Sequence, residues 1–245
     1  MDSRRDQERR AELDHHARVT VARGRIIVLE GQESAGKSTQ ATRLREWLAE
    51  RGVDAILVRE PGGTDAGEKI RELLLHLPYQ LTPEAEALLF MASRAELVDR
   101  VMQPALRDGR TVIMDRYFLS TYAYQVAGRG LDEDLVASAN TLATQGLRAD
   151  LTLLLTLSPS ERRERLDRRG GHDKIERAGD AFHSRVDAAF ERFADPAWQA
   201  SHPEAGPIVA VDGAGSENDV LARIIGALAD KWPETFAASS ESHHQ

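Results

Sequence analysis

The chain has 245 residues, of which 41% are hydrophobic and 29% charged, and its formal net charge is −8. This length and composition suit one α/β domain with at most a small insertion, while the negative charge argues against nucleic acid as a partner. The absence of cysteine excludes disulfides and thiolate metal sites and is typical of a reducing cytosol, so a cytoplasmic location is expected. The longest apolar stretches are only strand-sized, which argues against a membrane span or a signal peptide.

The two ends of the chain lack the pattern of a folded segment. Residues 1–23 carry charges of both signs without an extended helical stripe, and residues 237–245 are small and polar. The arginine pairs near the start can be read as a basic patch, but a solvated tail is the simpler interpretation. We therefore expect a disordered extension over residues 1–24, a folded domain over residues 25–235 and a disordered tail over residues 236–245.

Five short runs of β-branched and aliphatic residues alternate with amphipathic segments of helical length. Continuous apolar strands are expected where helices cover both faces of a parallel sheet. The pattern therefore predicts an α/β fold, a three-layer sandwich around a five-stranded parallel sheet. The expected strands are residues 26–29, 55–58, 111–114, 151–157 and 208–211.

The first run is followed at once by residues 31–39, which read Gly-Gln-Glu-Ser-Ala-Gly-Lys-Ser-Thr. In such a loop the backbone N–H groups wrap a phosphate, Lys37 can reach the β- and γ-oxygens, and the Ser38 hydroxyl can bind Mg²⁺. A glycine-rich turn with an idle lysine is the alternative. Because a strand precedes the loop and a helix-like segment, residues 39–51, follows it, the sequence predicts a nucleoside triphosphate site.

Polar residues also follow the second and third runs, where the carboxyl ends of parallel strands bind ligands. Pro61-Gly62-Gly63 allows a small molecule to approach the backbone closely, although alone it indicates only a surface loop. Asp115 ends the third run, where an acid can hold Mg²⁺ directly or through water. The planar fork of Arg116 suits a second, acceptor phosphate, and a salt bridge between the two neighbours is the alternative.

Residues 84–102 repeat apolar side chains at helical spacing, with Phe90 and Arg94 one turn apart. A ring and a guanidinium on one face can hold a planar base, the first by stacking and the second by a hydrogen bond to a ring carbonyl. Taken alone, Phe90 would more often be a core residue and Arg94 a solvated one.

Residues 162–177 are rich in arginine and contain Gly170-Gly171 near the middle. A mobile basic lid can close over a bound triphosphate, exclude water and place an arginine against the transferring phosphoryl group. The interleaved acidic residues leave a solvent-facing charged helix as the alternative.

Five motifs in this order resemble those of the bacterial thymidylate kinases, and the resemblance runs from Arg25 to about Trp232. They are Glu-Gly-x-Glu-x-Ala-Gly-Lys-Ser-Thr at residues 30–39, Arg-Glu-Pro-Gly-Gly-Thr at 59–64, Leu-Leu-Phe-x-x-x-Arg at 88–94, Asp-Arg-Tyr-x-x-Ser-Thr-x-Ala-Tyr-Gln at 115–125 and Asp-Lys-Ile-Glu at 173–176.

The family likeness implies a P-loop kinase fold, a nucleoside monophosphate kinase domain over residues 25–235 with a lid at about residues 162–177, and a homodimer. It also implies that ATP, with Mg²⁺, donates its γ-phosphoryl group to dTMP, giving dTDP and ADP for dTTP synthesis.

On the donor side, the resemblance implies that Lys37 and the loop hold the ATP phosphates, with Ser38 and Asp115 at Mg²⁺. Some relatives carry an arginine where Ser34 stands, so the catalytic arginine is expected from the lid, as Arg168 or Arg169. The implied ATP-binding residues are Gly31, Gln32, Glu33, Ser34, Ala35, Gly36, Lys37, Ser38, Thr39 and Arg165.

On the acceptor side, the resemblance places Phe90 on thymine, Arg94 at its carbonyl, and Arg116 at the phosphate. Tyr124 crowds the 2′ carbon, and Glu33 contacts the 3′-hydroxyl. Thr121 and Gln125 read the base edge, and Pro61 lies near the thymine methyl. The implied dTMP-binding residues are Glu33, Glu60, Pro61, Arg71, Phe90, Arg94, Arg116, Thr121, Tyr124 and Gln125, and the implied catalytic set is Lys37, Arg116, Arg168, Arg169 and Glu33.

Two departures from the family pattern concern the lid and the nucleoside pocket. Lys174 replaces an arginine, so a point charge stands for a bidentate fork. Phe190 stands near a position often held by tyrosine and lacks its hydroxyl.

Three alternatives to this function stay open. One is a related kinase for deoxyuridylate or a modified pyrimidine. Another is a GTP-dependent switch, although the sequence has no Asn-Lys-x-Asp guanine-binding motif. The third is a non-catalytic binding module, which the intact set of reactive residues argues against.

Overall fold

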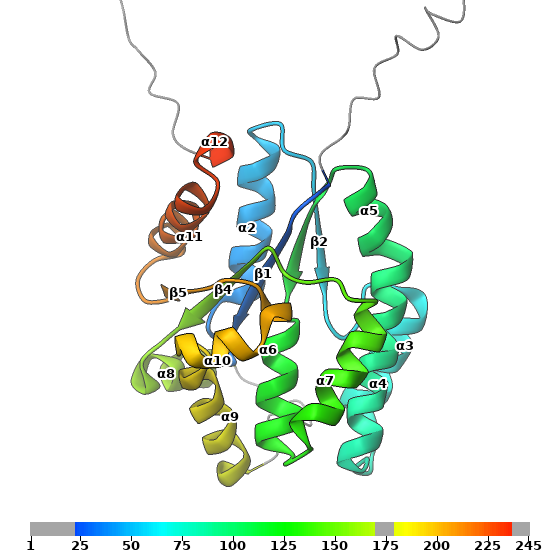
Figure 1. Cartoon of the computed structure of the whole chain (residues 1–245). Coiled ribbons are helices and arrows are strands. Elements are labelled where there is room, and N and C mark those ends of the chain that lie inside the picture. Colours follow the sequence, from blue (N-terminus) through cyan, green and yellow to red (C-terminus); the bar gives the residue numbers. More distant parts are fainter. Residues whose placement is uncertain (1–22, 170–178, 237–245) are drawn as a thin grey trace, which may run out of the picture.

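The computed structural model describes residues 23–169 and 179–236 and centres on one sheet of five parallel strands (Figure 1). The strand order is β2-β3-β1-β4-β5, so the first strand lies in the middle. In register, Ile27 of β1 pairs with Ile113 of β3 and with Leu151 of β4. The five predicted strands are confirmed, as β1 (Ile26–Gly31), β2 (Ala55–Arg59), β3 (Thr111–Asp115), β4 (Leu151–Thr156) and β5 (Ile208–Asp212).

Helices cover both faces of the sheet, and several extend beyond the carboxyl ends of the strands (Figure 1). Between β1 and β3 they are α2 (Lys37–Ala49), α3 (Asp65–His76), α4 (Pro83–Leu97), the π-helical turn η1 (Val98–Met102) and α5 (Gln103–Arg107). Between β3 and β4 they are α6 (Phe118–Thr121), the π-helical turn η2 (Tyr122–Gly128) and α7 (Glu133–Thr144). The remainder are α8 (Pro159–Arg169), α9 (Asp180–Arg192), α10 (Pro196–Ser201), the 3₁₀ turn η3 (Pro203–Ala205), α11 (Glu217–Lys231) and α12 (Pro233–Phe236).

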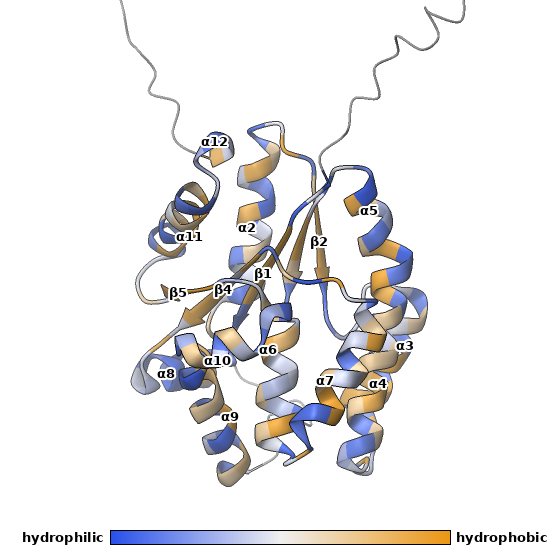
Figure 2. Cartoon of the chain, in the orientation of Figure 1, coloured by the Kyte–Doolittle hydropathy of each residue, from blue (hydrophilic) through white to orange (hydrophobic). Residues whose placement is uncertain are grey.

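Successive residues of the central strand contribute to two separate cores, because side chains alternate between the faces of a sheet. Ile26 and Val28 pack with η1, α5 and η2, whereas Ile27 and Leu29 pack with α2 and α11. All four are essentially inaccessible to solvent. Figure 2 shows these strands as an apolar centre between mixed helices. This double burial explains why the strands read as unbroken apolar runs.

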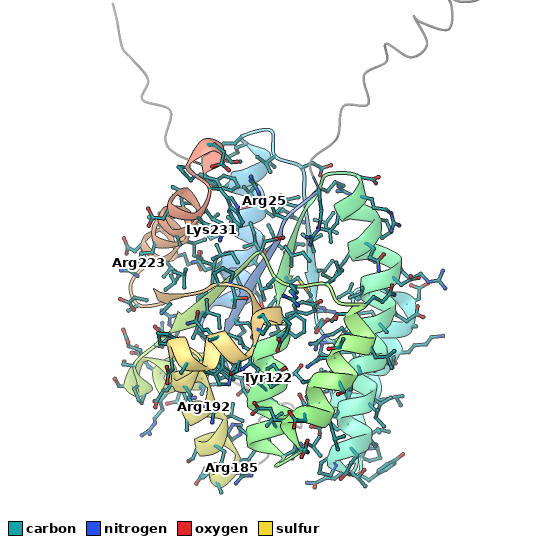
Figure 3. All side chains as sticks on the ribbon, viewed as in Figure 1. Arg25, Tyr122, Arg185, Arg192, Arg223 and Lys231 are labelled. Carbon is teal, nitrogen blue, oxygen red and sulfur yellow. The ribbon has the colours of Figure 1, made fainter. Side chains whose placement is uncertain are left out.

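Local capping fixes where the helices begin. Thr64 accepts a hydrogen bond from the Gly67 backbone N–H at 2.9 Å at the start of α3, and Thr82 caps α4 ahead of Pro83. Ser216 and Asp219 form a reciprocal capping box on α11, which also carries the exposed residues Arg223 and Lys231 labelled in Figure 3. The predicted helical segment 84–102 divides into α4 and the wider turn η1.

Arg25, just before β1, joins the start of the sheet to α12. Its guanidinium lies 4.8 Å from the Trp232 ring centroid and 5.5 Å from that of Phe236, and it donates to the Thr235 hydroxyl at 3.0 Å. Stacking and hydrogen bonding of one arginine therefore connect the two ends of the described domain.

Part of the prediction concerns residues that lie outside those described. These are nearly all of the extension over residues 1–24, the tail beyond Phe236, and the lid segment with Gly170, Gly171 and Lys174. Within residues 23–169 and 179–236, no helix combines the length and apolar character that crossing a membrane requires.

Candidate active site

A cavity of about 950 Å³ opens at the carboxyl ends of the strands. This is the place where open parallel sheets bind ligands, and the volume suits more than one small ligand. The predicted residues that line it are Glu33, Ser34, Ala35, Gly36, Lys37, Ser38, Thr39, Glu60, Pro61, Arg71, Phe90, Arg94, Asp115, Arg116, Thr121, Tyr124, Gln125, Arg165 and Arg168. Gly31 and Gln32 lie outside this lining, and the side chain of Arg169 is outside the described part of the chain.

The loop between β1 and α2 places Lys37 at the helix start. Gly36 is the N-cap of α2 at φ 95°, a left-handed conformation that glycine adopts without strain. The buried ammonium of Lys37 donates to the Gln32 carbonyl at 2.6 Å. Burial, and then repulsion from Arg116, lower the pKa of Lys37 to about 7. A bound anion would restore the full charge of this lysine.

Ser38 and Asp115 form a hydrogen-bonded pair that joins α2 to the end of β3. A hydroxyl and a carboxylate are hard oxygen donors, which suit Mg²⁺ when substrate phosphates and water complete the shell. Among the described residues there is no cluster of three or more His, Cys, Asp or Glu side chains able to hold a metal. The pair offers two oxygen atoms that could contribute to a Mg²⁺ site.

Arg116 sits in a strained backbone position at the end of β3. Its φ is 73°, in the left-handed region that favours glycine. Its Nη1 donates to the Ser120 hydroxyl at 2.9 Å and to the Gly31 carbonyl at 3.4 Å, so it does not form the neighbour salt bridge with Asp115 that was the alternative. Burial alone would lower the pKa of Arg116, but Tyr124 and nearby carboxylates raise it above its ordinary value.

Glu30, the one acidic residue of β1, explains how this conformation persists. Its carboxylate is 0% exposed and accepts from the backbone N–H groups of Tyr117 at 2.7 Å and Ser120 at 3.0 Å. The Ser120 hydroxyl donates to it at 2.7 Å while accepting from Arg116. The buried carboxylate thus fixes the turn that aims the guanidinium into the cavity.

Arg94 is buried rather than solvated, with an exposed fraction of 2%. It forms an ion pair with Glu60, and its Nε lies 3.0 Å and 2.8 Å from the two carboxylate oxygens. Nη2 also donates to the Tyr117 carbonyl at 3.0 Å, and Nη1 donates to Asn140. Burial alone would lower the pKa of Arg94, but the Glu60 carboxylate raises it. The guanidinium is therefore held charged and rigid at the cavity wall.

The loop after β2 and the face of α4 form the wall beside Arg94. Phe90 is half-buried and lines the cavity, so it is not a fully enclosed core residue. Pro61 is buried, and its carbonyl accepts from Arg71 Nη1 at 2.9 Å. The Gly62 N–H donates to Ser93 at 3.0 Å. This loop is an ordered part of the cavity wall, contrary to the plain surface loop that was its alternative.

The turn η2 supplies the opposite wall. The hydroxyl of Tyr124 donates to Glu33 at 3.2 Å, and the Tyr124 ring centroid lies 5.3 Å from the Arg116 guanidinium carbon. Burial raises the pKa of Tyr124, so it stays a neutral donor. Thr121 and Gln125 are both buried, one turn apart, and both line the cavity.

Three arginines of α8, a helix that Figure 2 shows as mostly hydrophilic, point in different directions. Arg162 pairs with Asp187 of α9, which also accepts from Gln32 of the phosphate loop at 2.9 Å. Arg165 donates to the Gly213 carbonyl at 2.8 Å and lines the cavity. Arg168 reaches the cavity while pairing with Glu164 at 3.5 Å, so this helix is partly solvated and partly turned toward the site.

Some residues that shape the site were absent from the sequence prediction. Glu30 and Ser120 occur in the quoted motifs without an assigned role, and Glu86 was not considered. Ser120 lines the cavity, whereas the roles of Glu30 and Glu86 follow only from their buried contacts. The segment of Gly213, Gly215, Ser216 and Glu217 also lines the cavity. It follows the fifth strand, so the rule applied to the first three strands would have found it.

Comparison with known proteins gives a consistent result. The family model for thymidylate kinase matches residues 29–205. The chain is 45% identical to thymidylate kinase of Clavibacter sepedonicus over 84% of this chain and 94% of that protein. It is 40% identical to that of Chlorobaculum parvum over 83% and 94%. A crystal structure of thymidylate kinase from Ehrlichia chaffeensis superposes with a TM-score of 0.66 at 28% identity, covering 84% of this chain and 98% of that one. The chain belongs to the thymidylate kinase family.

Proposed function

We propose that the protein is a thymidylate kinase that transfers the γ-phosphoryl group of ATP to dTMP, giving dTDP and ADP. The observation that carries the assignment is one cavity in which a phosphate loop with Lys37 faces a second cationic group, Arg116, held by Glu30. Family membership and the relatives' function agree with it. The product supplies dTTP synthesis.

The acceptor half offers a base site and a phosphate site. Phe90 provides a ring for stacking, Arg94 a donor for a ring carbonyl, and Arg116 a fork for the phosphate. The wall of the proposed dTMP site is completed by Glu60, Pro61, Arg71, Thr121 and Gln125. Tyr124 and Glu33 form one hydrogen-bonded unit beside Arg116, so we place the sugar there, with Glu33 at the 3′-hydroxyl and Tyr124 against the 2′ carbon.

The donor half binds and orients the triphosphate. The backbone N–H groups of residues 31–39 face its oxygens, and Lys37 neutralises charge on the β- and γ-phosphates. The acceptor phosphate oxygen is already anionic near neutral pH, so no general base is needed. The rate enhancement comes from positioning the two nucleotides and from stabilising the charge on the transferring phosphoryl group.

We propose Ser38 and Asp115 as the residues that hold Mg²⁺ with the nucleotide. The ion would supply charge neutralisation on the phosphates. The donor set supports this proposal, because both atoms are hard oxygen ligands joined in one hydrogen bond.

Arg168 and Arg169, at the end of α8, are our candidates for the arginine that stabilises the transferring phosphoryl group. Arg165 is closer to the loop, since a Cβ at Gly36 would lie 3.6 Å from its Nη1. We therefore assign Arg165 to the donor nucleotide. The lid that would bring the others inward covers about residues 162–177 of the single domain, 25–235.

A homodimer is the assembly that we propose. Exposed leucines on α4 and α7, two helices that pack together, support it: Leu88, Leu135 and Leu142 are 64%, 72% and 83% exposed. Light scattering of the pure protein and of Leu142→Glu tests this, and a monomeric wild type would contradict it. We place the enzyme in the cytoplasm, where both nucleotides and a reducing milieu occur.

A panel of nucleoside monophosphates with ATP and Mg²⁺ tests the function. We expect dTMP to give the highest kcat/KM, and chelation of the metal to abolish turnover. The same panel separates dTMP kinase from a deoxyuridylate kinase, since dUMP lacks only the 5-methyl group. Absence of dTMP phosphorylation would overturn the assignment.

A further inference from the structure

Gln125 is held from behind by a buried acid. Its Nε2 lies 3.3 Å from Oε1 of Glu86, a residue of α4 that is 5% exposed. The same carboxylate accepts from Arg129 Nε at 3.0 Å and Nη2 at 2.8 Å, which compensates its charge. Gln125 itself is 2% exposed and lines the cavity. The ion pair of Glu86 and Arg129, which lies outside the cavity lining, therefore binds the amide nitrogen of a side chain that lines the cavity.

The hydrogen bond to Glu86 determines which end of the Gln125 amide faces the ligand. An ionised carboxylate only accepts hydrogen bonds, so Gln125 must turn its NH₂ group toward Glu86. Its carbonyl oxygen Oε1 is then the end left for the cavity that Gln125 lines. The amide is fixed as an acceptor toward the base, although a glutamine can in principle present either group.

Hydrogen bonds to the backbone fix the turn η2 that carries Gln125. The carbonyl of Gln125 accepts from the Leu131 N–H at 3.2 Å, and that of Tyr124 accepts from the Arg129 N–H at 3.0 Å. Arg185 of α9, labelled in Figure 3, donates to the carbonyls of Ala127 at 3.0 Å and Gly128 at 2.6 Å. Because the turn is secured at both ends, the backbone of Gln125 stays in place, and the contact with Glu86 decides which way its amide is turned.

On the other wall, Arg94 is fixed as a donor. Its Nε and Nη2 groups donate to Glu60, and Nη2 also donates to the Tyr117 carbonyl. One N–H of Nη1 donates to Asn140, which leaves the other Nη1 N–H for a ligand. The cavity thus presents an acceptor and a donor, each set by buried partners. Thymine and uracil carry the complementary pair, an N3–H donor and an O4 acceptor, whereas cytosine reverses both positions.

We propose that Glu86 is a positioning residue that fixes the Gln125 carbonyl toward the base, and that it thereby selects 4-keto pyrimidines against cytosine. The inference rests on the proposed function and identifies the residue that enforces the choice of base. Glu86 touches no substrate and acts only through Gln125. Replacing its carboxylate by an amide would let Gln125 turn, because an amide both donates and accepts.

The test compares kcat/KM for dTMP, dUMP and dCMP in the wild type and in Glu86→Gln. We expect the ratio of dTMP to dCMP to fall about tenfold, since an unpaired or mismatched buried polar group is costly. The ratio of dTMP to dUMP should stay unchanged, because both bases show the same N3–H and O4. A merely structural defect would lower all three activities together and leave both ratios as they were.

Glu84→Gln is the matched control, because it removes the same charge from an exposed position two residues earlier on α4. It should leave both ratios unchanged. Gln125→Met removes both ends of the amide and covers the case in which Glu86→Gln does not fold, and here too the dTMP to dCMP ratio should fall. An unchanged ratio in a folded Glu86→Gln or Gln125→Met protein would overturn the inference. Failure of the wild type to phosphorylate dTMP would instead overturn the proposed function.

Discussion

The acceptor half and the donor half of the cleft are built in different ways. In the acceptor half, charged groups are paired within the protein: Arg94 is 2% exposed and bound to Glu60, and the half-buried Arg116 is linked to Glu30 through Ser120. In the donor half, Ser38 and Thr39 are exposed, and the Arg168 side chain is 68% exposed. Lys37 is buried there, but its nearest partner is a backbone carbonyl.

This difference indicates two modes of recognition. The acceptor site is preorganised, so little ordering is left to oppose binding, and selectivity among nucleotides can be high. The donor site gains most of its charge complement when phosphates arrive, because Lys37 and Arg165 contact backbone carbonyls and Arg168 contacts only an exposed carboxylate. Substitutions in the acceptor half should therefore alter the selectivity among nucleotides and the free energy of unfolding. Substitutions in the donor half should instead alter the charge and the protonation of the triphosphate site.

The largest expected effect is that of Arg116→Ala. We expect kcat to fall about 1000-fold or more, since an arginine on the reacting phosphates contributes that much, while ATP affinity stays close to the wild-type value. Steady-state kinetics and equilibrium ATP binding measure the two quantities. Arg100→Ala, at an exposed arginine of η1, should change neither. An equal loss of ATP affinity would move Arg116 to the donor half.

Glu60→Gln tests whether the acceptor half is held by its buried pair. Without the ionised carboxylate, Arg94 keeps a buried charge with weaker partners, so the free energy of unfolding should fall by about 3–5 kcal/mol. Urea denaturation measures it. Glu164→Gln, which removes an exposed partner of Arg168, should cost about 1 kcal/mol or less. Similar losses in the two variants would remove the contrast between the halves.

Phe90→Ala tests the base site directly. The loss of stacking should weaken dTMP binding by about 1–3 kcal/mol, with ATP binding unchanged. Calorimetric titration of each nucleotide is the measurement. Leu73→Ala, at an exposed leucine of the neighbouring helix α3, is the control. Unaltered dTMP affinity in a folded Phe90→Ala protein would assign the ring to packing alone.

The smallest expected effect is a proton taken up by Lys37. With a pKa of about 7 in the free protein, this lysine is about nine-tenths neutral at pH 8. Bound phosphates raise that pKa, so ATP binding at pH 8 should be accompanied by uptake of up to about one proton. Titration calorimetry in buffers of different ionisation heat detects it. Lys37→Met should show no such uptake, and identical heats in the two proteins would contradict the prediction.

Features that depend on neighbouring residues were predictable from the sequence. The five strands follow from apolar runs, and the phosphate loop from two glycines and Lys37 at fixed spacing after the first run. The strand-end rule then placed the loops after the second and third runs at one edge, and the cavity lies there. The lid could be predicted only in outline, and its central glycines lie outside the described residues.

Features that depend on distant partners were not predictable. Glu60 and Arg94 are 34 positions apart, and nothing near either residue signals a buried ion pair. On spacing alone Arg94 resembled a solvated arginine, although the structure encloses it. Glu86 and Gln125 are 39 positions apart on two helical elements. Glu60, Arg94 and Gln125 were all predicted at the ligand from their motifs, but the pairing of Arg94 with Glu60 and the acid Glu86 behind Gln125 appear only once the chain folds.

The contact of Arg25, just before β1, with Trp232 and with Phe236 of α12 has a practical consequence. Both elements lie at the end of the molecule opposite the carboxyl ends of the strands, where the cavity opens (Figure 1). An affinity handle or fluorophore joined near residue 23 or residue 236 would therefore emerge on the far side from the nucleotides. Anchoring the enzyme to a sensor chip by either end should leave ligand access free, provided that Arg25 and Trp232 are kept.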